Sequence, residues 1–280
     1  MIHIRDIAAY RIWRANLPAG ARVGFVPTMG ALHAGHASLA RQSLADNDYT
    51  VVSIFVNPTQ FGPTEDLDRY PRTPDADIAL LEALGVDVVF MPEAKEIYPA
   101  PPAQITFGIR SLDQKLCGAT RPGHMNGVLQ VVCILFHLIR PDRAYFGLKD
   151  YQQCLIIRQM VRELHFPLEV VPCPIIREAD GLAMSSRNRY LSPEERQQAL
   201  FLTRTLQAVQ AQRETFSTPA QALAYVQAQL PHWPGVRLDY FEILNGQDLS
   251  DIPDLDARWQ PVAFMAAFVG KTRLIDNLPL

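Results

Sequence analysis

Apolar runs and helical patterns alternate along the first two thirds of the chain. Short apolar runs typical of buried strands lie at residues 23–26, 51–56, 86–90, 144–146 and 168–171. Apolar residues at helical spacing lie between them, at residues 37–44, 73–84, 128–139 and 151–164. This alternation predicts an α/β fold, a Rossmann-like parallel sheet with helices on both faces. Ligands of such sheets bind at the carboxyl ends of the strands, so the residues after each strand are candidates for the site.

The pattern changes after about Pro174. A helix begins after Ser192, which forms a capping box with Glu195, and another begins after Thr218. Two strand-like runs follow these helices, at residues 237–243 and 262–269. A chain of 280 residues is near the limit of one hydrophobic core, which favours two domains. We predict a Rossmann-like nucleotide- and substrate-binding domain at residues 1–175 and a small α+β carboxyl-terminal lid domain at residues 176–280.

Composition narrows the possible partners. Hydrophobic residues make up 48% of the chain and the net charge is −3, so no basic field favours nucleic acid. No stretch approaches the about 20 apolar residues of a membrane span, and the first residues do not resemble a signal peptide. The four cysteines include no Cys-x-x-Cys pair. We therefore expect a cytoplasmic protein with buried, reduced thiols, no membrane partner and no zinc site.

Two histidines follow the strand that ends near Pro27. His33 and His36 flank Gly35, and residues 37–44 continue with helical spacing. The histidines therefore lie at the first turn of a helix that leaves the carboxyl end of a strand, where free N–H groups and the helix dipole attract phosphate. The pattern predicts a nucleotide phosphate held by two imidazoles. The alternative is a capped helix start with surface histidines.

Polar residues also follow the next strand. Asn57 and Gln60 come directly after residues 51–56 and reach the same edge of the sheet as the histidines. A glutamine amide both donates and accepts hydrogen bonds, which suits a small molecule with a hydroxyl and a carboxylate. The alternative is a turn capped by its own polar side chains.

A later strand end repeats this arrangement. Gly147 leaves room for a ligand, Lys149 suits a phosphate, Asp150 suits ribose hydroxyls, and Gln153 lies three residues further on. For Lys149 the alternative is a solvated surface charge.

The loop at residues 180–188 offers hydroxyls and a guanidinium to an anion. Ser185, Ser186 and Arg187 would clamp a departing pyrophosphate, or Arg187 would form a structural salt bridge. Residues 121–124 are interpreted as a helix entrance in preference to a second anion-binding loop. The acidic run at residues 65–68 is interpreted as a solvated helix start.

Six segments together resemble the pantoate–β-alanine ligase (pantothenate synthetase) family, of the His-x-Gly-His nucleotidyl transferases. They are residues 27–36, 55–61, 65–73, 146–153, 180–188 and 272–277. The resemblance implies that ATP and pantoate form pantoyl adenylate and pyrophosphate, and that β-alanine then attacks to give pantothenate and AMP. It also implies magnesium with the ATP, a small domain hinged over the large one, and a cytosolic homodimer.

The resemblance also implies roles for individual residues. His36 would be the proton donor, and His33, Lys149 and Arg187 would share the catalytic work. Gln60 and Gln153 would hold pantoate, with Gln60 also near β-alanine. The remaining ATP site would comprise Met29, Gly30, Ala31, Leu32, Ala34, Gly35, Gly147, Leu148, Asp150, Ile176, Met184, Ser185 and Ser186. Leu148 stands where the family usually has glutamate, so the resemblance does not define the detailed role of that loop. It also does not define the metal's protein ligands or the dimer interface.

Two other classes of protein remain possible from the residues. One is a nucleotidyl transferase that joins ATP to a phosphorylated alcohol or a mononucleotide, and paired Gln60 and Gln153 in place of a second phosphate site argue against it. The other is a non-catalytic nucleotide-binding regulator, which the set of His36, Lys149 and Arg187 disfavours. A tRNA-charging enzyme is disfavoured by the negative net charge and by the lack of a visible RNA-binding extension.

Overall fold

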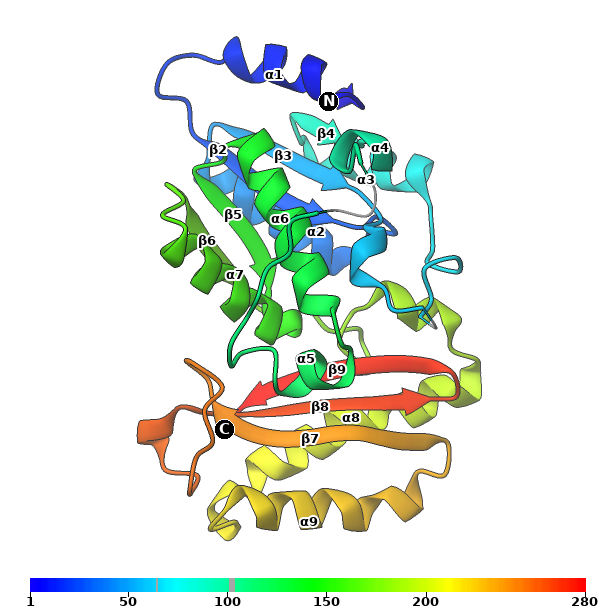
Figure 1. The fold of residues 1–280 in the computed structure, drawn as a ribbon. Coiled ribbons are helices and arrows are strands. Elements are labelled where there is room, and N and C mark those ends of the chain that lie inside the picture. The colour runs from blue at the N-terminus through cyan, green and yellow to red at the C-terminus, as the bar shows by residue number, and fades with distance from the viewer. Residues whose placement is uncertain (64, 101–103) are drawn as a thin grey trace.

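A six-stranded parallel sheet forms the larger part of the molecule. The computed structural model describes residues 1–63, 65–100 and 104–280. In spatial order the strands are β1 (Ile2–Ile4), β4 (Val88–Phe90), β3 (Tyr49–Ile54), β2 (Val23–Thr28), β5 (Arg143–Gly147) and β6 (Glu169–Cys173) (Figure 1). Every pairing between them is parallel. The predicted Rossmann-like α/β sheet is confirmed.

Helices cover both faces of this sheet because the strands are apolar on both sides. Phe25 and Val51 belong to the core under one set of helices, whereas Val26 and Val52 belong to the core under the other. The first set comprises α1 (Ile7–Ala15), α6 (His124–Ile139) and α7 (Tyr151–Glu163). The second comprises α2 (Ala34–Asp46) and α3 (Pro74–Leu84). Two short helices, α4 (Ala94–Ile97) and α5 (Leu116–Thr120), lie in the connections.

The order of the strands reverses between β2 and β5. From β2 the chain builds outward through β3 and β4, and it then returns to place β5 on the other side of β2. Loops that leave neighbouring strands on opposite sides of such a reversal open a crevice at the carboxyl ends of the strands. The residues after β2 and after β5 therefore face a common space.

A three-stranded antiparallel sheet forms the smaller part. Its strands are β7 (Val236–Asn245), β8 (Pro261–Val269) and β9 (Thr272–Pro279), with β8 in the centre. The helices α8 (Pro193–Ala211) and α9 (Pro219–Gln229) pack on the face turned away from the large sheet (Figure 1). The capping box of Ser192 and Glu195 begins α8 as predicted. Single 3₁₀ turns are η1 (Pro58–Gln60), η2 (Leu148–Asp150), η3 (Ser186–Tyr190), η4 (Arg213–Thr215), η5 (Leu230–His232) and η6 (Ala257–Trp259).

The small sheet is docked on the large part through an apolar cluster. Leu116 of α5 packs in this cluster with Val262 and Phe264 of β8. Tyr151, the first residue of α7, places its ring edge-on to Phe264 at 5.3 Å between ring centroids. Its hydroxyl donates to the Gly246 carbonyl at 2.9 Å. The start of α7 is therefore fixed by the small sheet.

Several predicted elements are present with slightly different bounds, and some expectations were wrong. The helix predicted over residues 128–139 begins earlier, at His124, so the segment 121–124 is a helix entrance as interpreted.

The acidic run 65–68 forms bends and turns and begins no helix, because Glu65 and Asp66 point inward to arginines. Cys133 is only half-buried, whereas the other three cysteines are buried. The strands β1 and β9 and the helix α1 were not predicted.

Among the described residues, no helix combines the length and the apolar character that a membrane crossing requires.

Candidate active site

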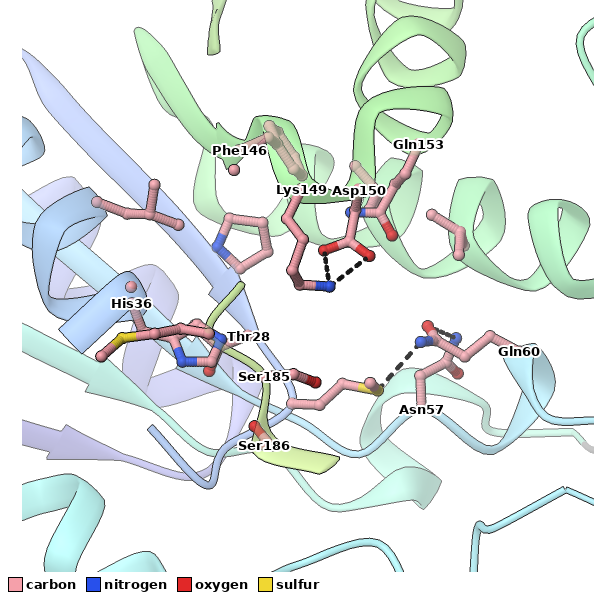
Figure 2. Close-up of a pocket in the computed structure, with 18 of the residues that line it drawn as sticks. Thr28, His36, Asn57, Gln60, Phe146, Lys149, Asp150, Gln153, Ser185 and Ser186 are labelled. Atoms are coloured by element: carbon pink, nitrogen blue, oxygen red, sulfur yellow. Dashed lines mark hydrogen bonds and ion pairs between the residues drawn. The ribbon is translucent and has the colours of Figure 1, made fainter. Parts of the chain in front are cut away.

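A cavity of about 230 Å³ opens at the carboxyl ends of β2 and β5. Most of the predicted site residues line it: Met29, His33, Gly35, His36, Gln60, Gly147, Lys149, Asp150, Gln153, Ile176, Met184, Ser185, Ser186 and Arg187. Figure 2 shows Lys149, Asp150 and Gln153 on one side and His36, Ser185 and Gln60 on the other. The fold thus brings together residues from four strand ends and one loop of the later chain.

Five predicted residues do not line this cavity. Ala31 and Leu32 are buried behind the turn that carries the histidines, together with Gly30. Ala34 is exposed, and Leu148 packs against the core of the large part.

A second cavity, of about 340 Å³, continues the first toward the small sheet. Tyr240 and Arg273 of the small part line it, and it shares Lys149 and Arg187 with the first cavity. The site is therefore a cleft between the two parts of the molecule.

The two imidazoles stack at the start of α2, with their ring centroids 4.1 Å apart. His33 is the N-cap residue, and its Nδ1 accepts from the Gly35 N–H at 3.1 Å. Nδ1 of His36 accepts from the His33 N–H at 3.3 Å. Because each Nδ1 is an acceptor, each neutral ring carries its proton on Nε2. A phosphate in the cavity would meet two imidazole N–H donors.

Gly35 is required for this arrangement. A Cβ at this position would lie 2.9 Å from two atoms of the His33 ring, which is too close for a real side chain. The glycine between the histidines therefore has a steric role, because the His33 ring lies directly over its backbone.

Burial keeps both imidazoles neutral. Burial, together with a smaller effect of nearby Lys149, lowers the pKa of His36 to about 3 and the pKa of His33 to about 4. At neutral pH the rings are therefore uncharged hydrogen-bond donors and not cations. This state suits a site that must also hold Lys149 without charge repulsion.

Asp77, on the first turn of α3, holds the turn that precedes the histidines. Gly30 and Ala31 both have positive φ, 82° and 49°, which leaves the N–H groups of the turn pointing inward. The Asp77 carboxylate, 2% exposed, accepts from the Ala31 N–H at 2.9 Å and from the Leu32 N–H at 2.8 Å. Sequence reasoning missed this residue, because Asp75 and Asp77 are alike as first-turn acids and only the packing distinguishes them.

The residues of the later loop hold the same turn from the opposite side. The Ser186 hydroxyl donates to the Ala31 carbonyl at 3.0 Å, and the Arg189 guanidinium donates to the Leu32 carbonyl at 3.3 Å. The Ser185 hydroxyl accepts from the Arg187 N–H at 3.3 Å. Of the two adjacent serines, Ser186 is thus engaged in structure, while Ser185 caps the turn that presents Arg187.

Lys149 and Asp150 form an ion pair in the turn after β5. The distance from Lys149 Nζ to the carboxylate is 3.2 Å, and Figure 2 shows the pair facing the cavity. Burial alone would raise the pKa of Asp150, but Lys149 and Arg187 hold it below its usual range. The carboxylate is therefore anionic, and Lys149 is one of the cations of the site.

Amide groups make up the wall opposite Lys149. Gln60 Oε1 accepts from Asn57 Nδ2 at 3.1 Å, and Gln60 Nε2 lies 3.0 Å from the sulfur of Met29. Asn57 Nδ2 also donates to the Gly127 carbonyl on α6 at 3.0 Å. The alternative interpretation, a turn capped by its own polar side chains, is correct for Asn57, because its Oδ1 accepts from the Thr59 N–H at 3.3 Å. Gln60 nevertheless remains in the cavity wall.

Two arginines enter the cavity, and each is paired with a residue of the acidic run. Arg187 donates twice to Asp66 at 2.8 Å, with its guanidinium 5.6 Å from the centre of the Tyr70 ring. Arg121 donates to Glu65 at 2.7 Å and contacts His124. The structural salt bridge considered for Arg187 therefore exists, although Arg187 also lines the cavity.

The His124 ring belongs to the same wall of the cavity. Its Nδ1 lies 2.8 Å from the Gln60 carbonyl, and burial together with the nearby charge of Arg121 lowers its pKa to about 4. From the sequence, a helix entrance was preferred for residues 121–124 over a second anion-binding loop, yet Arg121 and His124 also line the cavity. An arginine and a histidine three residues apart were the signal for this part of the site.

The described residues include no group of three or more His, Cys, Asp or Glu side chains that could hold a metal ion. Asp150 is the only carboxylate among the described residues that line the first cavity.

The doubly wound sheet, with a His-x-Gly-His turn at its point of reversal, places the chain in the class of Rossmann-like α/β proteins that bind ligands at the carboxyl edge of a parallel sheet. The model of the pantoate–β-alanine ligase family matches residues 2–279, so the chain belongs to this family and is a ligase.

Relatives agree in sequence and in structure. The pantothenate synthetase of Acidobacterium capsulatum is 53% identical over 259 residues, which cover 92% of this chain and 86% of that protein. The pantothenate synthetase of Moorella thermoacetica is 46% identical and covers 99% of this chain and 98% of its own length. The crystal structure of the Thermus thermophilus pantothenate synthetase superposes with a TM-score of 0.92 at 45% identity, with coverage of 100% of this chain and 99% of that chain.

Proposed function

We propose that this chain condenses pantoate with β-alanine at the expense of ATP and releases AMP and pyrophosphate. The observation that carries the proposal is that one cavity is lined both by donors suited to phosphates, His33, His36, Lys149 and Arg187, and by the amides of Gln60 and Gln153. A Francisella tularensis pantoate–β-alanine ligase, crystallised in complex with β,γ-ATP and β-alanine, supports it at 35% identity and a TM-score of 0.84 over all of this chain and 97% of that one.

In the first step the pantoate carboxylate forms a bond to the α-phosphorus of ATP. The bond from that phosphorus to the bridging oxygen breaks, and pyrophosphate leaves with the electron pair. Negative charge grows on the departing group, so donors fixed in advance lower the barrier. We assign this role to the Nε2–H groups of His33 and His36, to Lys149 and to Arg187. With a pKa near 3, His36 acts as a neutral hydrogen-bond donor at neutral pH.

In the second step the β-alanine amine attacks the acyl carbon of pantoyl adenylate. The carbon–oxygen bond to the phosphate breaks, AMP leaves, and the amine loses a proton as the amide forms. Gln60 and Gln153 would hold the hydroxyl and carboxylate oxygens of pantoate. Its dimethyl carbon would pack against the apolar wall that α6 contributes through Val128, Val131 and Leu135.

Arg187 must engage a phosphate while Asp66 is close to it. A guanidinium has five N–H donors, and the Asp66 pair uses two of them. We propose that the remaining donors face the phosphates and that Asp66 fixes the guanidinium plane. Ser185, which caps the Arg187 turn, and Ile176 and Met184 beside it would complete the nucleotide site.

Magnesium fits this site as a companion of ATP and not as a resident metal. Mg²⁺ commonly keeps several waters and binds substrate phosphates with one or two carboxylates. Asp150, held anionic by its neighbours, is the carboxylate that the cavity offers. The ion would offset phosphate charge, and the protein would contribute Asp150 as its ligand.

We further propose a homodimer located in the cytoplasm. Ile105 is 76% exposed and lies beside the half-buried Phe107 and Ile109, an apolar segment that a second copy could cover. All four cysteines are free, which suits a reducing compartment. Sedimentation of the wild type and of Ile105→Lys tests the dimer. Monomers in both samples would contradict it.

We propose a boundary between two domains near residue 175. Residues 1–175 contain the parallel sheet, and residues 176–280 contain the small sheet that forms the far wall of the second cavity. We propose that the small part closes over the cleft and protects the labile adenylate from water.

Single-turnover release of pyrophosphate tests the proposed function. ATP, magnesium and pantoate without β-alanine should release about one pyrophosphate per site, and pantothenate and AMP should follow once β-alanine is added. A carboxylate becomes a good acyl donor only after it is activated, which predicts this order. Product formation with no earlier pyrophosphate would contradict the adenylate. No product from any of these mixtures would contradict the function itself.

A further inference from the structure

Asn277, on the last strand of the small sheet, contacts the backbone of the turn that carries Lys149. Its side-chain amide donates to the Leu148 carbonyl at 2.8 Å and to the Lys149 carbonyl at 3.0 Å. Asn277 is only 3% exposed, so these bonds form away from bulk water. Residues 272–277 are one of the six segments that resemble the family, but the sequence analysis assigned them no role in the site.

The strand that carries Asn277 is itself held firmly. Asn277 pairs with Phe264 in β8, and its N–H donates to the neighbouring Asp276 carboxylate at 2.8 Å. Asp276 is buried and receives two hydrogen bonds from Arg177, at 2.7 and 3.0 Å. A buried carboxylate with these partners cannot move freely, because any displacement would leave a charge unpaired. Asn277 is therefore a rigid support.

The turn that Asn277 contacts leads directly into the site. The 3₁₀ turn η2 spans Leu148–Asp150, and α7 begins at the next residue, Tyr151. The side chain of Lys149 therefore lines the cavity, while its backbone carbonyl accepts a hydrogen bond from the small sheet. A shift in this carbonyl displaces the Lys149 ammonium in the cavity.

We propose that Asn277 is a positioning residue for Lys149, through which the small domain sets the place of a cation of the active site. The inference rests on the proposed function, which gives Lys149 a role at the phosphates. An amide with two N–H donors matches two adjacent carbonyls, whereas a carboxylate offers only acceptors. The small domain therefore contributes to the catalytic geometry as well as covering the cleft.

The substitution Asn277→Asp tests this with almost no change of shape. It removes both donors and places acceptor oxygens against two carbonyl oxygens. Displacement of a catalytic group by about 1 Å can lower a rate about 100-fold, so we expect single-turnover pyrophosphate release to fall about 10- to 100-fold. The measurement uses the full chain with ATP, magnesium and pantoate.

A double-mutant cycle separates positioning from general damage. The four proteins are wild type, Asn277→Asp, Lys149→Ala and the double variant. If Asn277 acts through Lys149, then Asn277→Asp will slow the wild type but change the rate of Lys149→Ala by less than about threefold. Gln210→Glu is the matched control, because its amide also donates to a β9 carbonyl, that of Pro279, at 2.7 Å. It should leave the rate unchanged.

The outcomes distinguish failure of this inference from failure of the proposed function. An Asn277→Asp rate near that of wild type, or an equal loss on both backgrounds, overturns the positioning role while the role of Lys149 stands. A Lys149→Ala rate near that of wild type overturns both the catalytic role that we propose for Lys149 and the positioning role of Asn277. If Asn277→Asp does not fold, Asn277→Ala, which removes the donors without adding repulsion, takes its place in the same cycle.

Discussion

The turn after β2 and the turn after β5 enter the same cavity from the two sides of the sheet reversal, but they are fixed by opposite backbone chemistry. In the histidine turn, residues of positive φ direct N–H groups inward, and the Asp77 carboxylate accepts them. In the lysine turn, two carbonyls point toward the small domain, and the Asn277 amide donates to them. The N–H groups of the histidine turn are held by Asp77 of α3, and its carbonyls by Ser186 and Arg189 of the later loop, whereas the carbonyls of the lysine turn are held by the last strand of the small sheet.

The two turns also differ in charge. Burial keeps His33 and His36 neutral, so they offer N–H donors whose tautomers the local backbone fixes. Lys149 instead forms an ion pair with the Asp150 carboxylate at 3.2 Å. A site with neutral donors on one side and a paired cation on the other can hold a polyphosphate while limiting repulsion between its own groups.

The largest effect is expected on the histidine side. His36→Ala should lower single-turnover adenylation by about 100-fold or more, which is typical of the loss of one donor to a transition state. His232, an exposed histidine of the small part, provides the control, and His232→Ala should react like the wild type. A His36→Ala rate within threefold of wild type would remove the histidine turn from the mechanism and leave the lysine turn as the main source of stabilisation.

A second effect concerns pantoate and the two amides of the cavity, Gln153 beside Lys149 and Gln60 opposite it. Gln153→Ala and Gln60→Ala should each weaken pantoate binding by about 1.5–3 kcal/mol, the usual value for a hydrogen bond to a charged group, and change ATP binding much less. Separate titrations with the two ligands measure this. Gln159→Ala, further along the same helix as Gln153, is the control. If both glutamine variants weaken ATP as much as pantoate, the amides belong to the nucleotide site.

The anchor of the histidine turn can be broken by itself. Asp77→Asn replaces one acceptor with a donor that faces an N–H group, so we expect a loss of about tenfold in the adenylation rate and of about 1–3 kcal/mol in the free energy of unfolding. Asp75→Asn, an exposed acid of the same helical turn, should change neither quantity. Pyrophosphate release and urea unfolding should be measured on both variants. A loss of stability with an unchanged rate would make the anchor purely structural.

The smallest effect near neutral pH follows from the depressed pKa values of His33, His36 and His124. The unfolded chain binds protons at these histidines near pH 6.5, whereas the folded chain binds them only near pH 3 to 4. The free energy of unfolding should therefore fall as the pH drops from about 6.5 toward about 4. Urea titrations between pH 7.5 and pH 5 measure the slope, and His36→Asn should reduce it. A constant or rising stability would show that the imidazoles are not buried in neutral form.

Much of the site could be predicted because its residues follow strand ends. The motif from His33 to His36, the pair Lys149 and Asp150, and the glutamines all come directly after apolar runs, and a parallel sheet gathers such positions at one edge. The acidic run could not be interpreted from its own residues. Glu65 and Asp66 meet Arg121 and Arg187 from distant parts of the chain, and a local pattern of charges does not reveal partners separated by 56 and 121 residues.

The sequence by itself determined the class of fold, the strand-end motifs and the family resemblance, because apolar periodicity and short motifs are local properties of a chain. Only the tertiary structure decided which strands are neighbours, and therefore that the histidine and lysine turns share a crevice. It also singled out Asp77 from Asp75 and brought Asn277 to the Lys149 turn. These roles depend on directional hydrogen bonds between groups far apart in sequence, so they exist only once those distant segments have packed together.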